Sequence, residues 1–306
     1  MKQITPLHQM LSHAHKNRYA VGSFSPRSTL LIEPIIKAAM ETDSPVLIQV
    51  SQKELDRHAL DLLSFSKAFH TAIETLNPSI PVGLHLDHTK DLAIIQEAIN
   101  CGFTSVMIDA SEFPYEENSA ITKKVVAMAH KSGVDVEAEL GRIGTTDYIE
   151  TIEVNTQFTN PVEAIQFIET CQIDALAVSV GTSHGVYHTK GPTISLPIIE
   201  AINRESPTPL VLHGGSGVPK ELLHEAITLK QGGISKVNIA TDLELCMLGA
   251  LNLSDHLSQA QLDRLSDTQK KEAQDAVQHL VVKKMKEFVL SSGWGIKALK
   301  DFGILQ

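Results

Sequence analysis

The chain has few cysteines and no excess of positive charge. Its 306 residues include three cysteines, at positions 101, 171 and 246, and these form no CxxC pair. Such a sparse, odd set indicates reduced thiols in a cytoplasmic protein. The formal net charge of −10 argues against partners such as nucleic acid or an anionic membrane, because binding to either needs a basic surface.

Long apolar runs and linkers are also missing, and we expect no leader sequence. No apolar stretch is long enough to cross a bilayer, and polar sequence follows Met1 directly. No segment rich in Pro, Gly or Ser and no charge block divides the chain, so we expect one domain over residues 1–306. No GxGxxG motif follows the first predicted strand, which disfavours a dinucleotide-binding sheet.

The sequence does contain a regular alternation of strand-like and helix-like segments. Its apolar runs predict eight strands, at Tyr19–Phe24, Pro45–Val50, Pro81–Leu86, Thr104–Ile108, Val134–Ala138, Ala175–Val180, Pro209–Leu212 and Val237–Ala240. Helices are expected between them, at Leu30–Glu41, Ala68–Leu76, Asp91–Cys101, Glu117–Ser132, Pro161–Thr170, Leu196–Asn203 and Lys220–Leu229. Continuously apolar strands indicate a parallel sheet that is buried on both faces. Eight such units predict an α/β fold, a (β/α)₈ or TIM barrel, with a doubly wound open sheet as the alternative.

Two segments exceed a minimal barrel. The polar connection Gly141–Thr159 is long enough to suggest a lid. Residues 250–306 are expected to form a helical extension, with two helices within Leu253–Val289. We expect this extension either to plug the barrel or to pack in a subunit contact.

Three histidines follow predicted strands. His88 comes after the third, His184 after the sixth and His213 after the seventh. Because the carboxyl ends of barrel strands surround one opening, the three imidazoles are expected to converge there. Three imidazoles with an open fourth position are typical of catalytic zinc, so Zn²⁺ is the expected cofactor. Asp109 and Glu139 end two further strands and are candidate partners of these histidines or alternative ligands.

The last two strands end in residues suited to a phosphate group. The glycine-rich turn Gly214–Gly217 follows the seventh strand, and residues 238–241 end the eighth. Barrels place phosphates there, on backbone N–H groups and a helix N-terminus. Ser216 and Thr241 add hydroxyl donors.

A metal ion beside a phosphate and a carboxylate suggests chemistry next to a carbonyl. The ion polarises a ketone, and Asp87 as general base takes the proton of the hydroxyl whose collapse breaks the C–C bond. We therefore expect retro-aldol cleavage of a ketose phosphate. No lysine ends a predicted strand at the opening, and Lys236 precedes the eighth, which disfavours a Schiff base.

Six motifs together resemble one family. LHLDH, SVMIDAS, VEAELG, GTSHGVY, VLHGGSG and VNIATDL occur in this order along nearly the whole chain. They are similar to those of the class II, metal-dependent fructose/tagatose-bisphosphate aldolases. The resemblance implies that Asp87 is the catalytic acid/base, that His88, His184 and His213 bind zinc, and that Asp109 and Glu139 can take a second or displaced metal. It also implies cytoplasmic homodimers or homotetramers.

The resemblance also implies a substrate site and a cation site. The substrate, a sugar phosphate with a dihydroxyacetone phosphate part, is expected to contact Ser51, Gly185, Gly214, Gly215, Ser216, Asn238, Ile239, Ala240 and Thr241. Gly185 and Ser216 match positions that can hold a monovalent cation.

The chain departs from the family pattern in three places. Ser25 follows Phe24 where the family usually has Asn, and Ala240 is more like the tagatose-type branch. The lid glutamate that handles the enediolate proton is not fixed by the motif, and the candidates are Asp147, Glu150 and Glu153. Arg27 follows the first strand, where it either pairs with a second anion of the substrate, a phosphate or a sulfonate, or is a surface arginine.

Two other functions stay open from the residues alone. One is a metal-dependent hydrolase on the same barrel, whose H-x-H signature is absent after the first strand. The other is a non-catalytic sugar-phosphate-binding subunit, although such a subunit need not keep Asp87 and three histidines. Release of dihydroxyacetone phosphate with and without a chelator distinguishes these alternatives.

Overall fold

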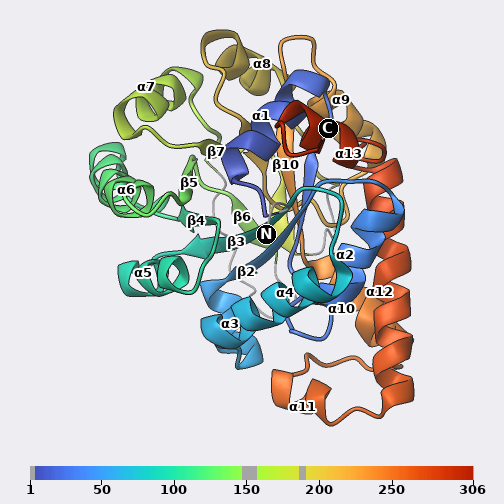
Figure 1. The fold of residues 1–306 in the computed structure, drawn as a ribbon. Helices are drawn as coiled ribbons and strands as arrows, with labels where there is room; N and C mark the ends of the chain where they lie inside the picture. Colours follow the sequence, from blue (N-terminus) through green and yellow to red (C-terminus); the bar gives the residue numbers. More distant parts are fainter. Residues whose placement is uncertain (1–3, 147–156, 186–190, 306) are drawn as a thin grey trace.

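A closed barrel of eight parallel strands forms the centre of the computed structural model, which describes residues 4–146, 157–185 and 191–305. The strand order around the barrel is β1-β10-β9-β7-β5-β4-β3-β2 (Figure 1). The strands are β1 Val21–Phe24, β2 Val46–Ser51, β3 Val82–Thr89, β4 Ser105–Ile108, β5 Asp135–Leu140, β7 Ala175–Val178, β9 Leu210–Leu212 and β10 Ile234–Ile239. This topology confirms the predicted (β/α)₈ barrel and excludes the open sheet.

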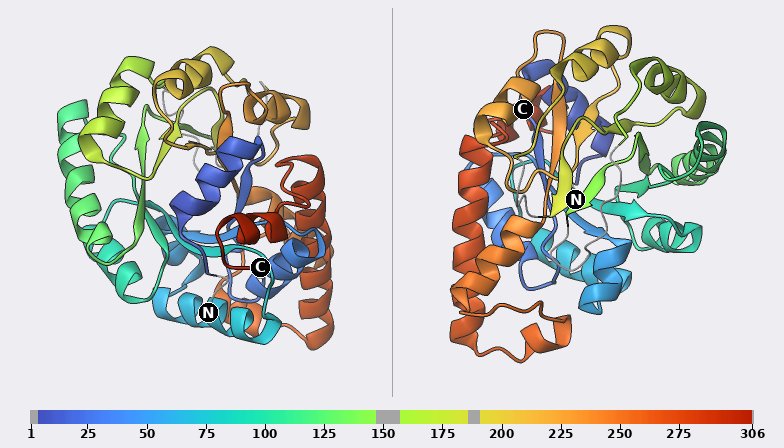
Figure 2. Two further views of the ribbon diagram at one scale, coloured as in Figure 1. Left: turned by 45° about the horizontal axis from the view of Figure 1, so that its top comes forward. Right: turned by 180° about the vertical axis from the view of Figure 1, so that it is seen from behind.

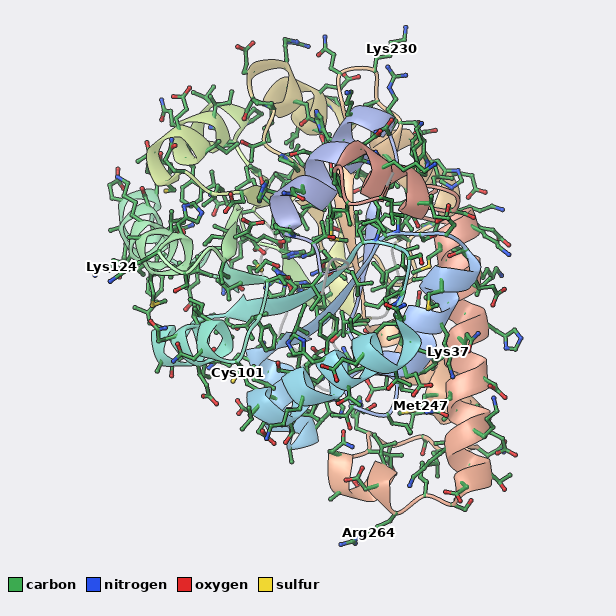
Figure 3. The ribbon with its side chains drawn as sticks, viewed as in Figure 1. Lys37, Cys101, Lys124, Lys230, Met247 and Arg264 are labelled. Atoms are coloured by element: carbon green, nitrogen blue, oxygen red, sulfur yellow. The ribbon has the colours of Figure 1, made fainter. Side chains whose placement is uncertain are left out.

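Helices surround the barrel because each presents one apolar face to the sheet (Figure 2). They are α2 Ile32–Glu41, α3 Gln52–His58, α4 Leu62–Leu76, α5 Leu92–Asn100, α6 Tyr115–His130, α7 Pro161–Cys171, α8 Leu196–Glu205, α9 Lys220–Ile227 and α10 Thr241–Ala250. Asn160 caps α7 by accepting the N–H groups of Val162 and Glu163. Figure 3 shows charged side chains such as Lys37 and Lys124 on the outer surface.

Helix α1 (Leu7–Asn17), which the sequence analysis did not predict, closes the barrel at the amino-terminal ends of the strands. Its buried apolar side chains pack on side chains from inside the barrel, in a cluster of Leu7, Met10, Leu11, Ala14, Tyr19, Val21, Leu47, Met107, Ala175, Ala177 and Val211. The backbone N–H of Thr5 donates to the carbonyl of Val82 at the start of β3 (3.0 Å). The plug is therefore the first helix of the chain.

The C-terminal extension lies outside the barrel. It contains α11 Gln259–Asp263, α12 Asp267–Glu287 and α13 Gly295–Asp301. The long helix α12 packs against α2 and α10 (Figure 1). Its apolar side chains Ala273, Val277, Val281 and Met285 are fully buried. The expectation that this extension plugs the barrel is wrong, because α1 occupies that end.

Strand β3 continues past its predicted end at Leu86 and runs to Thr89. Its pairing with β4 shifts register between Leu86 and Thr89, and His88 has a φ of +27°. A positive φ is uncommon for a residue other than glycine, and such conformations cluster at functional sites. Neighbouring side chains of a regular strand point to opposite faces, whereas at this irregular end Asp87 and His88 both line one cavity.

Two short strands form a separate pair in which β6 (Gly144–Thr146) is parallel to β8 (Ser183–Gly185). His184 lies in β8. The predicted lid, Gly141–Thr159, contains β6, but its candidate acids Asp147, Glu150 and Glu153 lie outside the described residues. Among the described helices, none is long and apolar enough to cross a membrane.

Candidate active site

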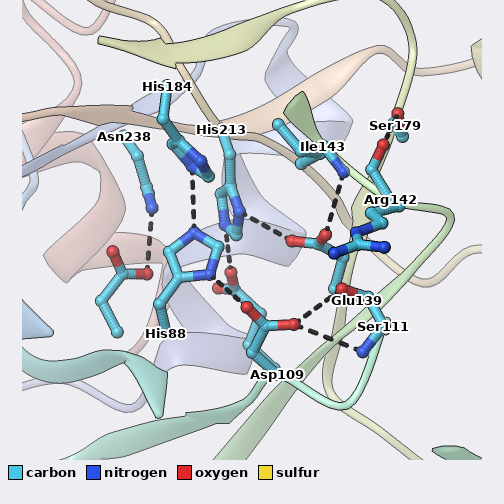
Figure 4. Close-up of polar contacts among 12 residues, drawn as sticks. His88, Asp109, Ser111, Glu139, Arg142, Ile143, Ser179, His184, His213 and Asn238 are labelled. Atoms are coloured by element: carbon cyan, nitrogen blue, oxygen red, sulfur yellow. Dashed lines mark hydrogen bonds and ion pairs between the residues drawn. The ribbon is translucent and has the colours of Figure 1, made fainter. Parts of the chain in front are cut away.

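Three imidazoles meet at the carboxyl-terminal end of the barrel (Figure 4). His88 comes from β3, His184 from β8 and His213 follows β9. The Nε2 atoms of His88 and His184 are 3.1 Å apart, and the ring centres of His88 and His213 are 4.3 Å apart. One nitrogen of each ring lies within 4.8 Å of one nitrogen of each of the others. The structure thus brings the three predicted histidines together around one point.

Carboxylates orient two of these rings. Nδ1 of His88 is 2.9 Å from Oδ2 of Asp109, whose Oδ1 accepts the hydroxyl of Ser111 at 2.7 Å. Nδ1 of His213 is 3.2 Å from Oε2 of Glu139. A carboxylate that binds one ring nitrogen fixes the tautomer, and at His88 it leaves Nε2 to a metal. Both nitrogens of His213 contact carboxylates, because its Nε2 lies 2.9 Å from Oε1 of Glu137, so a metal ion at this ring would displace one of them. The same contacts leave Asp109 and Glu139 near His88 as a second group that could hold an ion.

The pKa values in this cluster move in opposite directions. Burial lowers the pKa of His88, but Asp87 and Asp109 outweigh it and raise it to about 10. Burial, and then the neighbouring His88 and His213, lower the pKa of His184 well below its ordinary value. Burial and His88 lower the pKa of His213, but Glu137 and Glu139 outweigh them and raise it. The surrounding carboxylates therefore favour positive charge at this cluster, which is the electrostatic demand that a bound cation meets.

Asp87 is buried, and amide groups on both sides orient it. The side-chain N–H groups of Gln49 and Asn238 donate to Oδ2 and Oδ1 of Asp87, each at 3.0 Å. Burial alone would raise the pKa of Asp87, but His88 and Lys236 hold it below its ordinary value. The carboxylate is therefore ionised and able to accept a proton. Gln49 was not identified from the sequence, although it lies two residues before the end of β2.

A charged pair lies inside the barrel near Asp87. Lys236 is part of β10 and does not precede that strand as the sequence analysis supposed. Its Nζ is 2.7 Å from Oε2 of Glu137, and both side chains are fully buried. Oε1 of Glu137 is 2.9 Å from Nε2 of His213. The ammonium group of Lys236 is therefore paired, and the pair lies next to the histidine cluster.

A cavity of about 390 Å³ opens above these groups. Its lining includes Asp87, His88, His184, Asp109 and Glu139, and, of the predicted substrate residues, Ser51, Gly185, Gly214, Ser216, Asn238, Ala240 and Thr241. The other two predicted residues do not line it: the side chain of Ile239 is buried in the core, and the N–H of Gly215 donates to the carbonyl of Asn238 at 3.0 Å.

The glycine-rich turn lies beside the first turn of α10. Gly214 has a φ of +67°, and a Cβ atom there would be 2.3 Å from the carbonyl oxygen of Ser183. Only glycine fits such a position. Oγ of Ser216 accepts the N–H of Asp242 at 3.2 Å, within the first turn of α10. Backbone N–H groups at a helix N-terminus suit a phosphate.

The cavity wall also includes basic side chains. Arg27 lines the cavity, but its guanidinium already pairs with Glu54 (Nε to Oε1, 2.8 Å) and with Glu244. Its charge is therefore compensated by two carboxylates within the protein. Further basic residues that the sequence analysis missed also line the cavity, namely Lys53, Arg57, Lys90 and Arg142. Lys53 and Arg57 could have been found from the sequence, because both lie on α3, which begins directly after β2 and therefore at the same end of the barrel.

Comparison with known proteins decides the family. The model of the family "Fructose-bisphosphate aldolase class-II" matches residues 5–293. This chain belongs to the class II aldolases. It is 38% identical over 266 residues to a fructose-bisphosphate aldolase of Giardia intestinalis, and the aligned region covers 80% of this chain and 81% of that protein. It is 40% identical over 237 residues to a sulfofructosephosphate aldolase of Alkalicoccus urumqiensis (77% and 80%).

A solved structure agrees with this membership. The YdjI aldolase from Escherichia coli K12 superimposes with a TM-score of 0.79 at 30% identity, over 95% of this chain and 98% of that one. The class II aldolases are metal-dependent carbon–carbon lyases that act on sugar phosphates. The chain is therefore an enzyme of this class, and neither the hydrolase nor the non-catalytic subunit fits its membership.

Proposed function

We propose that this class II aldolase cleaves a ketose 1-phosphate reversibly to dihydroxyacetone phosphate and an aldehyde, with Zn²⁺ bound by His88, His184 and His213. The observation that carries the proposal is the single cavity that Asp87 shares with His88, His184 and the glycine-rich turn. Such a cavity would unite a proton acceptor, a cation site and a phosphate site.

The donor set supports a divalent ion. The distance of 3.1 Å between Nε2 of His88 and Nε2 of His184 is close to the roughly 3.4 Å between two ligands of a tetrahedral zinc ion. A Lewis acid in this place would polarise the ketose carbonyl group. Asp109 and Glu139 would orient the ligand rings or take up a second cation, and Gly185 and Ser216 are the candidates for a monovalent one.

Asp87 would move the proton in the cleavage step. Its carboxylate takes the proton of the C4 hydroxyl, the C4–O bond becomes the aldehyde carbonyl, and the electron pair of the C3–C4 bond passes to C3 as the enediolate. Gln49 and Asn238 hold the carboxylate in place through the two 3.0 Å bonds. An acid of the segment 147–153 is the candidate for returning a proton to C3.

The substrate would carry a second anion at C6. Gly214, Ser216, Asn238, Ala240 and Thr241 would hold the 1-phosphate, while Ser51 and the basic residues of the wall would face the other end. Lys53, Arg57 and Lys90 join Arg27 as candidates for that contact. The candidate substrates are fructose 1,6-bisphosphate, tagatose 1,6-bisphosphate and a ketose 1-phosphate with a C6 sulfonate.

Turnover of a panel of ketose 1-phosphates, with coupled detection of dihydroxyacetone phosphate, tests the proposal. We expect activity that is lost after EDTA, restored by Zn²⁺ and unaffected by borohydride. Activity that survives chelation, or that borohydride abolishes, would contradict it. Comparing Arg27→Ala with Lys53→Ala on substrates with and without the C6 anion assigns the distal contact, and sedimentation tests the expected dimer or tetramer.

A further inference from the structure

A further group of side chains that could hold a metal ion lies at the opposite end of the barrel from the catalytic cavity. His8 is in the first turn of α1, Asp135 begins β5 and Asp174 immediately precedes β7. One ligand atom from each lies within 4.8 Å of one from each of the others. His130, the last residue of α6, adds a second imidazole, with Nε2 2.8 Å from Oδ2 of Asp174.

We propose that His8, Asp135 and Asp174, with His130 beside them, bind a divalent transition metal ion that joins the plug helix α1 to the barrel wall. Two imidazoles and two carboxylates are a donor set that suits zinc, cobalt or nickel. The site is distinct from the catalytic centre, because it is built at the amino-terminal ends of β5 and β7.

The distances fit such an ion with little movement. Nδ1 of His8 is 3.0 and 2.9 Å from Oδ1 and Oδ2 of Asp135. Two ligands of a tetrahedral zinc ion are about 3.4 Å apart, so that the ring and the carboxylate need to separate by only a few tenths of an ångström.

The surrounding contacts hold both carboxylates in place. The backbone N–H of His8 donates to Oδ2 of Asp135, and that of Val136 donates to Oδ2 of Asp174, each at 2.7 Å. Burial and, to a smaller extent, the neighbouring charge of Asp174 raise the pKa of Asp135. Two carboxylates held this close repel each other, and a cation between them relieves the repulsion.

A route from solvent reaches the group. A surface hollow is lined by His130 and Asp174, together with Glu169, Gln172, Glu205 and Ser206. About half of the His8 side chain is exposed, whereas Asp135 is buried. Ligand identity, spacing, orienting hydrogen bonds and an entry path are the features that a metal site must combine. An ion here would connect segments 127 residues apart in the chain.

Metal counting on the full chain tests the proposal. After chelator treatment, equilibrium dialysis against Zn²⁺ should give one bound equivalent fewer for His8→Ala/Asp174→Asn than for the wild type. His279→Ala, which removes an exposed histidine on α12, is the matched control and should bind as the wild type does. Equal binding by all three proteins would overturn the proposal.

Thermal unfolding separates this site from the catalytic one. In a His184→Ala/His213→Ala background, Co²⁺ should still raise the Tm, and adding His8→Ala should abolish the rise. His8 is half exposed, so this single change covers the case in which the Asp174 variant does not fold. A Tm that ignores Co²⁺ in the His184→Ala/His213→Ala protein refutes the site and leaves the aldolase proposal untouched, since that depends on turnover by the wild type.

Discussion

Removing the buried ammonium group of Lys236 should strongly destabilise the barrel. Lys236→Met leaves Glu137 fully buried without the partner that now lies 2.7 Å away. Burial raises the pKa of Glu137, and Lys236 together with His213 and His85 outweighs this and lowers it, with Lys236 the largest of the three, so the carboxylate depends on that charge. Removing one partner of a buried ion pair costs about 3–5 kcal/mol.

This cost converts into a measurable shift of Tm. At ~2.1 cal/mol/K per residue, the unfolding entropy of 306 residues is about 0.64 kcal/mol/K, so that Lys236→Met should lower Tm by about 5–8 °C. Thermal unfolding by circular dichroism, in EDTA and in Zn²⁺, measures the shift. Methionine keeps most of the side-chain volume, which limits the contribution of a cavity.

A double variant and a surface pair make the test specific. Lys236→Met/Glu137→Gln removes both charges, keeps a polar group near His213 and should recover at least half of the lost stability. Lys37→Met removes an exposed ammonium 2.6 Å from Glu33 on α2 and should cost less than about 0.5 kcal/mol (Figure 3). If Lys236→Met costs no more than Lys37→Met, or if the double variant is no better than the single one, the reasoning is wrong.

Three further outcomes follow from the site. Asp87→Asn should lower kcat by about 10²–10⁴-fold while the zinc content stays that of the wild type, which kinetics and metal analysis check. Gly214→Ala should lower the free energy of unfolding by at least about 1–2 kcal/mol, because φ is +67° and the new Cβ would meet the carbonyl oxygen of Ser183. The same change should raise KM for the ketose phosphate, and an unchanged KM would argue against a phosphate there. Burial, and then Lys236, lower the pKa of His85 to about 3, so below about pH 6.5 the unfolded chain binds a proton that the folded one excludes. The wild type should therefore lose up to about 1.4 kcal/mol per pH unit between pH 6.5 and 3 from this residue, and His85→Gln should flatten denaturant-derived stability over that range.

The barrel and the convergence of its histidines could be predicted because they depend on local sequence patterns and on the general geometry of the fold. Each βα unit repeats a continuously apolar strand and an amphipathic helix, and the closure of eight parallel strands brings their carboxyl ends to one opening. His88, His184 and His213 were predicted to meet for that reason alone. No distance between them had to be known.

The plug helix was missed although a signal was present. Leu7, Met10, Leu11 and Ala14 follow the i, i+3, i+4, i+7 spacing of a helix with one apolar face, and all four are fully buried. Three histidines and a lysine in the same segment give it a polar composition, which concealed the pattern. Periodicity was the correct guide here, and composition was not.

The paired charges could not be predicted from sequence because each depends on a partner far along the chain. Lys236 is 99 residues from Glu137, and Arg27 is 217 residues from Glu244. A lysine within a strand is expected at an edge, unless a buried carboxylate compensates it. For Arg27, the position after β1 left open a contact with a second anion of the substrate or a surface arginine, whereas Glu54 and Glu244 already bind its guanidinium group.

These pairs matter for the chemistry because they fix the charges around Asp87. The carboxylate is buried, so its ionisation depends on His88 and Lys236, and the lysine is held in turn by Glu137. A cation at the three imidazoles would add to the same field and favour the ionised base. The pKa of Asp87 therefore depends on all of these charges together. A variant of Lys236 that still folds should have a higher pKa at Asp87, so that kcat falls at a higher pH when the solution is acidified.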